Sequence, residues 1–192
     1  MVGASPLLRA VFRDVQHLYG PEDEGFVFED GPGPIGHIDV LVYRPTPRIP
    51  VTTFATVGMA AGEMPATPGP GAGGRAELRF SWRGQPTPEW ESAVAQLLAN
   101  LAAYPWITDQ QLGWGHMMTL EDDFPGFPDC RTVMFAGPLF PDAQDIFEAD
   151  GTTVRILNIV PLTDTETARA RTMPSGFFLT ELMNEVDLFS PR

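Results

Sequence analysis

Short runs of alternating residue types, separated by prolines and glycines, constrain the fold of this chain more than any other feature. Over residues 37–43, Ile38, Val40 and Val42 alternate with His37, Asp39, Leu41 and Tyr43. A period of two predicts a strand whose faces meet different surroundings. The same pattern over residues 76–83 predicts a strand with one buried face and one face in water. The chain must therefore build a sheet.

Other segments add strands and helices to this sheet. Further strands are predicted over 26–28, 51–57, 132–136 and 154–160, and a short strand or turn over 112–118. Ser5-Pro6 and Thr87-Pro88 each open a helix with a capping hydroxyl and a proline in the first turn. Gly20-Pro21 should end the first helix, and Pro105 the second. Two more helices are expected over 163–171 and 177–186.

Residues 58–74 are rich in glycine, proline and alanine, which suit neither a helix nor a strand ladder. We expect a long mobile loop there. The strands on either side of it are too few to fold separately, so residues 1–192 are predicted to form one domain.

The composition excludes several classes of protein. The only cysteine is Cys130, so no disulfide can form within the chain, and we expect a cytoplasmic protein without a membrane segment or signal peptide. The formal charge is −13, from 25 acidic and 12 basic residues. This balance argues against nucleic acid as a partner and suits a basic protein, although acidity can also serve solubility alone.

His37, Asp39 and His116 are the residues that suggest catalysis. His37 and Asp39 would share a strand face about 6 to 7 Å apart, and with His116 they could form a metal site of two histidines and a carboxylate. A purely structural role, with hydrogen bonds to neighbours, is the favoured interpretation. Common hydrolase and nucleotide-binding motifs are missing from the sequence, and Cys130 reads as an inert thiol. We therefore predict no catalytic residue, metal or cofactor.

Two other features suggest binding. The acidic cluster Glu121-Asp122-Asp123, and the later run of Asp142, Asp145, Glu148 and Asp150, could face a cationic partner or simply be solvated. Trp114, between Gly113 and Gly115, could be an exposed contact residue or a plug in the core.

In their order and spacing, five segments resemble the Suppressor of fused domain family, specifically its bacterial single-domain members. They are residues 37–45 (HIDVLVYRP), 54–59 (FATVGM), 75–80 (RAELRF, followed by the helix of Trp90), 112–116 (LGWGH) and 157–162 (LNIVPL, leading into a helix with Thr165-Glu166). The resemblance implies an α/β (α+β) domain in which helices flank a mixed, mostly antiparallel sheet. His37, Asp39, Gly58, Gly113, Gly115 and His116 would then be structural signature residues.

The resemblance also implies a protein without a catalytic centre that works by binding other proteins. Eukaryotic relatives hold a short extended peptide beside their own strands, and bacterial relatives are proposed as immunity proteins that neutralise a toxin. We expect no second domain of the kind that completes the peptide clamp, which favours a basic toxin. Trp114, Glu121, Asp122, Asp123 and the predicted loop are the expected contacts. A peptide-binding adaptor and a small metal-dependent hydrolase using His37, Asp39 and His116 are the alternatives.

Overall fold

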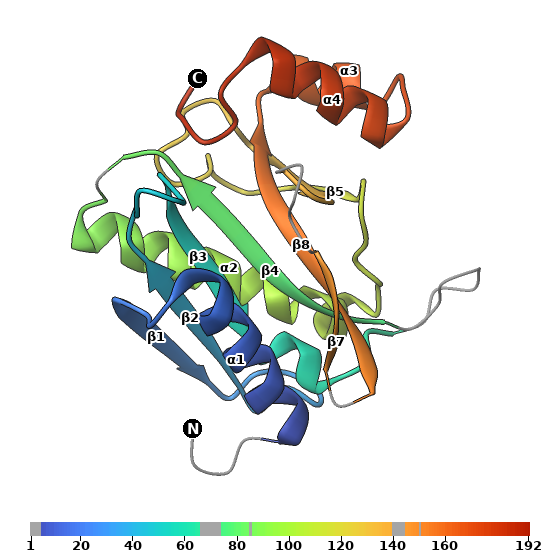
Figure 1. Ribbon diagram of the computed structural model, residues 1–192. Coiled ribbons are helices and arrows are strands. Elements are labelled where there is room, and N and C mark those ends of the chain that lie inside the picture. Colours follow the sequence, from blue (N-terminus) through green and yellow to red (C-terminus); the bar gives the residue numbers. More distant parts are fainter. Residues whose placement is uncertain (1–4, 66–73, 85, 140–144, 150) are drawn as a thin grey trace.

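Eight strands form one mixed sheet in the computed structural model, which describes residues 5–65, 74–84, 86–139, 145–149 and 151–192 (Figure 1). The elements are α1 (Pro6–Tyr19), β1 (Glu24–Glu29), β2 (His37–Tyr43), β3 (Thr52–Val57), the 3-10 helix η1 (Met59–Ala61), β4 (Arg75–Trp82), α2 (Pro88–Thr108), β5 (Met117–Thr119), β6 (Thr132–Ala136), β7 (Ile146–Ala149), β8 (Thr152–Leu162), α3 (Asp164–Ala170) and α4 (Ser175–Glu185).

The strand order is β1-β2-β3-β4-β8-β6-β5, and β7 also pairs with β8. The β4–β8 pair is parallel, and the other described pairs are antiparallel. The predicted mixed, mostly antiparallel sheet with flanking helices is therefore confirmed. The segment 154–160, predicted as a strand, lies in β8, which pairs with β4 on one side and with β6 and β7 on the other.

The largest core lies between α2 and one face of the sheet. Val94 and Leu98 of α2 are fully buried there with Phe54 of β3 and Phe80 of β4. Thr87 caps α2 by accepting the N–H of Trp90, as predicted. Pro105 does not end this helix, which continues to Thr108. A proline removes one backbone hydrogen bond, and the helix tolerates that loss while Trp106 beyond it packs against the core.

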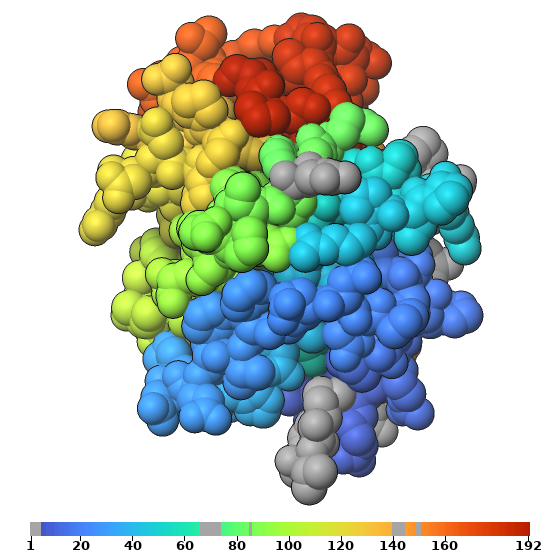
Figure 2. All heavy atoms as spheres, turned by 90° about the vertical axis from the view of Figure 1, so that its left-hand side faces the viewer, coloured from blue at the N-terminus to red at the C-terminus, as the bar shows by residue number. Residues whose placement is uncertain are grey.

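The opposite face of the sheet carries α1 at one end and α3 and α4 at the other (Figure 1). Val11 and Val15 of α1 pack on Val154, while Phe178 and Leu182 of α4 pack on Val160 further along the same side of β8. The C-terminal residues return to the turn after β4, where the N–H of Arg83 donates to the carbonyl of Phe189 (Figure 2).

The predicted strand over 76–83 forms, but the prediction of a solvent-exposed face is wrong. Glu77, Arg79 and Ser81 are buried along with the apolar residues between them. The reason is tertiary: α1 and the buried Asp145 lie on this side of β4, and the polar groups find partners there.

Two further differences concern loops. Residues 66–73 of the predicted mobile loop lie outside the described part of the chain. Its first residues contradict the prediction, because η1 packs against the sheet and buries Met59, Ala60 and Met64. Strand β7 has no counterpart among the predicted elements. No helix among the described residues is long and apolar enough to cross a membrane.

Candidate partner-binding groove

A groove of about 320 Å³ opens between α4 and the end of β6. We call it the Trp114 groove. Trp114 and Met134 line it from the sheet side, and Leu179 and Met183 line it from α4; its remaining lining residues are Gly115, Ala136, Gly137, Pro138, Ser175, Gly176 and Thr180. None of these residues is charged, so the groove offers an apolar surface with two hydroxyl groups.

Trp114 is both anchored and accessible. Its indole Nε1 donates to the carbonyl of Ile156 at 3.1 Å, and its ring lies against Gly137. Ile156 lies on β8 between the residues that pair with β7 and those that pair with β6, where neither strand pairs with β8. The indole therefore gives the carbonyl of Ile156 a hydrogen-bond donor at a point where the strand ladder is interrupted. The side chain still exposes 45% of its surface. A fixed but half-exposed aromatic ring is suited to a binding surface, because little entropy is lost when a partner covers it.

The helix side of the groove is equally accessible. Met183, which lines the groove from α4, exposes 41% of its surface. On the other side of α4, Phe178 and Leu182 are buried against β6 and β8, which fixes the helix in place. Large exposed apolar side chains that line one groove, here Trp114 and Met183, are typical of an interaction site.

The predicted acidic contacts lie beyond β5, at the other end of that strand from Trp114. Glu121, Asp122 and Asp123 are all exposed. Asp123 pairs with Arg131 at 3.1 Å, and the hydrogen bond from the N–H of Asp129, together with this ion pair, lowers the pKa of Asp123. Within the described residues, Glu121 and Asp122 form no ion pair, so their charges are open to a partner.

The structure separates His116 from His37 and Asp39. Strands β3, β4, β8 and β6 lie between β2 and β5, so about five strand spacings, or roughly 24 Å, divide them. The described part of the chain contains no cluster of three His, Cys, Asp or Glu residues able to hold a metal ion. The three residues of the metal-hydrolase alternative therefore cannot form one site.

Each histidine instead has local contacts. His37 Nε2 lies 3.9 Å from Asp39 Oδ2, and burial raises the pKa of that carboxyl. The ring of His116 packs edge-on against that of Phe135, with 6.0 Å between the ring centroids. Burial lowers the pKa of His116.

The signature glycines differ in what requires them. Gly58 has φ +143°, and a Cβ there would lie 2.5 Å from the carbonyl oxygen of His37. Gly115 has φ +87°, and its Cβ would meet Ser175. Gly113 has open space around it. Gly58 and Gly115 are thus required by the backbone, whereas nothing in the structure requires a glycine at position 113.

Cys130 is buried among apolar residues, which raises its pKa to about 11. At neutral pH it is a protonated thiol, the form that does not act as a nucleophile.

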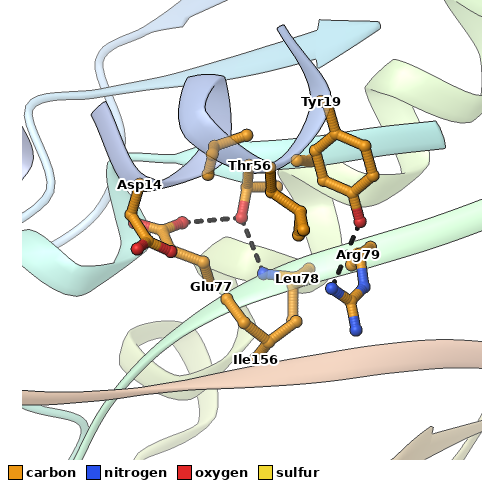
Figure 3. Close-up of a pocket in the computed structure, with 10 residues that line it drawn as sticks. Asp14, Tyr19, Thr56, Glu77, Leu78, Arg79 and Ile156 are labelled. Atoms are coloured by element: carbon orange, nitrogen blue, oxygen red, sulfur yellow. Dashed lines mark hydrogen bonds between the residues drawn. The ribbon is translucent and has the colours of Figure 1, made fainter. Parts of the chain in front are cut away.

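Sequence reasoning missed a buried polar network below α1. Arg79 of β4 forms an ion pair with Asp145 and donates from Nε to Asn158 Oδ1 at 2.7 Å. Arg79 also reaches the hydroxyl of Tyr19 on α1 at 3.2 Å (Figure 3). Asn158 Nδ2 donates to the carbonyl of Gly137, the residue on which Trp114 lies. The network therefore links α1 to the floor of the Trp114 groove.

The expectation that Asp145 belongs to a solvated run of charges is wrong, because Asp145 is buried and only 2% exposed. Asp142 and Asp150 of that run lie outside the described residues. A charged residue buried by tertiary packing leaves no sign in the local sequence. The one available hint was that Arg79 and Asn158 both fall inside predicted strands.

A family model described as Suppressor of fused protein (SUFU) matches residues 36–192. The match begins after α1 and β1 and includes every residue that lines the Trp114 groove. No curated protein matches the chain in sequence.

Solved structures share the fold at low identity. A SUFU homolog from Neisseria gonorrhoeae FA 1090 has a TM-score of 0.70 and 18% identity, covering 96% of this chain and 93% of that chain. The Sufu-Fu complex crystal structure has a TM-score of 0.68 and 16% identity, covering 95% of this chain and 85% of that chain. Drosophila Suppressor of Fused gives 0.67 and 16%, covering 95% of this chain but 47% of that chain, so the match spans about half of its length.

Proposed function

Because the chain belongs to the Suppressor of fused protein family, we propose that it is a non-catalytic binding protein whose Trp114 groove receives a segment of a partner protein. The observation that carries this proposal is the half-exposed Trp114, fixed from behind by Ile156 in a groove without charged lining. The relative solved as a Sufu-Fu complex supports a protein as the class of partner.

The charge of the chain supports a basic partner. Most of its arginines are already in ion pairs, including Arg79, Arg131 and Arg169, so the surplus of acidic side chains dominates the surface. An acidic surface steers a cationic protein into contact and accelerates association. We propose that Glu121 and Asp122 take part in this steering, and that apolar side chains of the partner then enter the groove.

On this basis we favour an immunity function in the cytoplasm, in which the protein covers a basic toxin. A short extended peptide of a regulatory partner is the alternative occupant. The two differ in what should bind: an immunity protein needs the folded toxin, whereas an adaptor retains affinity for an isolated peptide.

Trp114→Ala is the direct test. The partner is first captured from the native host and identified by mass spectrometry, and it is then purified for calorimetry. Removing the indole should weaken binding at least tenfold, because a central aromatic anchor contributes about 2 kcal/mol or more.

Val27→Ala is the matched control, since Val27 is 65% exposed on β1, away from the groove. It should leave affinity unchanged. A partner that binds Trp114→Ala as tightly as the unaltered protein, with both folded by circular dichroism, contradicts the proposal.

A further inference from the structure

Glu77 of β4 is buried beneath α1 and holds the segment Gly58–Ala61 against the sheet. One carboxylate oxygen accepts the N–H of Gly58 at 2.9 Å and that of Ala60 at 3.0 Å. The other accepts the hydroxyl of Thr56 at 2.6 Å, as the dashed line in Figure 3 shows. One side chain on a neighbouring strand therefore accepts the hydrogen bonds of two backbone N–H groups at a short helical turn.

Arg75, two residues earlier on β4, holds the same segment by its carbonyl groups. It donates to the carbonyl oxygens of Ala60 at 2.7 Å and of Ala61 at 2.6 Å. At the start of the segment, the positive φ of Gly58 gives the chain its sharp turn. The segment is thus a short unit with a glycine at one end, and polar side chains of β4 fasten it.

The surroundings of Glu77 do not neutralise its charge. A cavity of about 20 Å³ separates it from α1, which contributes Asp14 and Tyr19 to the cavity wall. Arg79 also lines the cavity, but its guanidinium is paired with Asp145, and Arg75 contacts η1 and Glu63. From β3, η1 and β8 the cavity receives no ionisable side chain. Among the described residues, none forms an ion pair with Glu77.

A buried carboxylate without a counter-charge is costly, and hydrogen bonds from the backbone of Gly58, Met59 and Ala60 and from a hydroxyl offset only part of this cost. Burial accordingly raises the pKa of Glu77 to about 7. Burial also raises the pKa of Asp14 across the cavity.

We propose that Glu77 is a pH-responsive latch, which keeps the segment Gly58–Ala61 docked while its carboxyl is protonated and favours opening of the segment when the carboxyl ionises. In the open state water reaches the carboxyl, so its pKa returns towards 4.5, the ordinary value for Glu. A group with a higher pKa in the closed state stabilises that state at low pH, and this contribution is lost as the pH rises through the closed-state pKa. Opening therefore becomes easier towards alkaline pH.

Opening of the latch should also loosen the packing of α1. Ala60 is buried in the small core that holds Val11 and Val15 of α1, and α1 rests directly on η1. Release of the segment would thus loosen the helix that covers the polar network. The latch does not depend on the Trp114 groove, so either proposal can fail without the other.

Amide hydrogen exchange by NMR tests the latch in the full chain. The protection factors of Gly58 and Ala60, corrected for intrinsic exchange rates, should fall about tenfold between pH 6 and pH 8. The fall follows from the difference between the pKa of Glu77 in the closed state and its pKa in the open state. Glu77→Gln, which keeps the shape and cannot ionise, should abolish this fall. Asp14→Asn, which neutralises the facing carboxyl, should retain most of it.

Protection that is independent of pH in the unaltered protein overturns the proposal, and so does an equal fall in Glu77→Gln. Should Glu77→Gln not fold, the unaltered protein decides the matter by itself. The latch requires Gly58 and Ala60 to lose more protection than central amides such as Leu157 of β8, and a uniform loss overturns it.

Discussion

At the scale of single residues, the buried charges of this protein are its most unexpected feature. Arg79 and Asp145 lie in the protein interior, where an ion pair must be fully hydrogen-bonded to offset its desolvation. Asn158 and Tyr19 provide these additional bonds. These bonds thereby hold Asp145 and the end of α1 at the centre of the sheet.

Removing one charge of this pair should be strongly destabilising. Asp145→Asn leaves the Arg79 guanidinium buried without compensation, and we expect the free energy of unfolding to fall by about 3 to 5 kcal/mol. Urea denaturation followed by circular dichroism measures the change.

The matched control is Asp187→Asn, which breaks the exposed ion pair with Arg83 and should cost no more than about 1 kcal/mol. Equal losses in the two variants would contradict the structural role of the buried pair.

At the scale of secondary structure elements, local signals were reliable where they depend on neighbouring residues. Ser5, Thr87 and Thr163 each cap the helix that follows. The capping hydroxyl and the backbone N–H that it accepts lie within a few residues, so the sequence contains the whole interaction. Alternation placed β2 and β4 correctly for the same reason.

Local signals failed where a partner came from elsewhere in the chain. Alternation in β4 predicted a face in water, yet α1 covers Glu77 and Arg79, and Arg79 pairs with the buried Asp145. Glycine and alanine around η1 predicted a loop, but side chains of β4 fasten its backbone. Strand β7 is only four residues long and carries the charged Glu148, and it forms by pairing with β8.

The cap of α3 gives a prediction at this scale. Thr163 and Glu166 form a reciprocal capping box, with the hydroxyl of Thr163 accepting the N–H of Glu166. Thr163→Ala should lower the midpoint of thermal unfolding, because a lost N-cap costs about 1 kcal/mol.

Thr165→Ala, at an exposed position of the same helix, is the control and should leave the midpoint unchanged or slightly raised. If the two variants unfolded at the same temperature, the box would contribute nothing to stability.

At the scale of the whole molecule, the charge of −13 sets how a partner approaches. If the partner is basic, its association rate should fall at least tenfold between 50 and 500 mM salt, because screening shortens the range of attraction. The dissociation rate should change far less, since the Trp114 groove is apolar. Surface plasmon resonance separates the two rates.

Glu121→Gln combined with Asp122→Asn should slow association without altering the dissociation rate. A salt-independent association rate would show that the negative charge serves only solubility.

The sequence by itself determined what neighbouring residues and composition decide: the capped helices, most strands, the negative charge, and through ordered motifs the family and its mixed sheet. The tertiary structure alone decided which residues meet. It separated His116 from His37 and Asp39, buried Arg79 with Asp145 and Glu77 beneath α1, and placed Trp114 between the core and water. Such contacts join residues far apart in the chain, and their energies depend on burial, which no local pattern records.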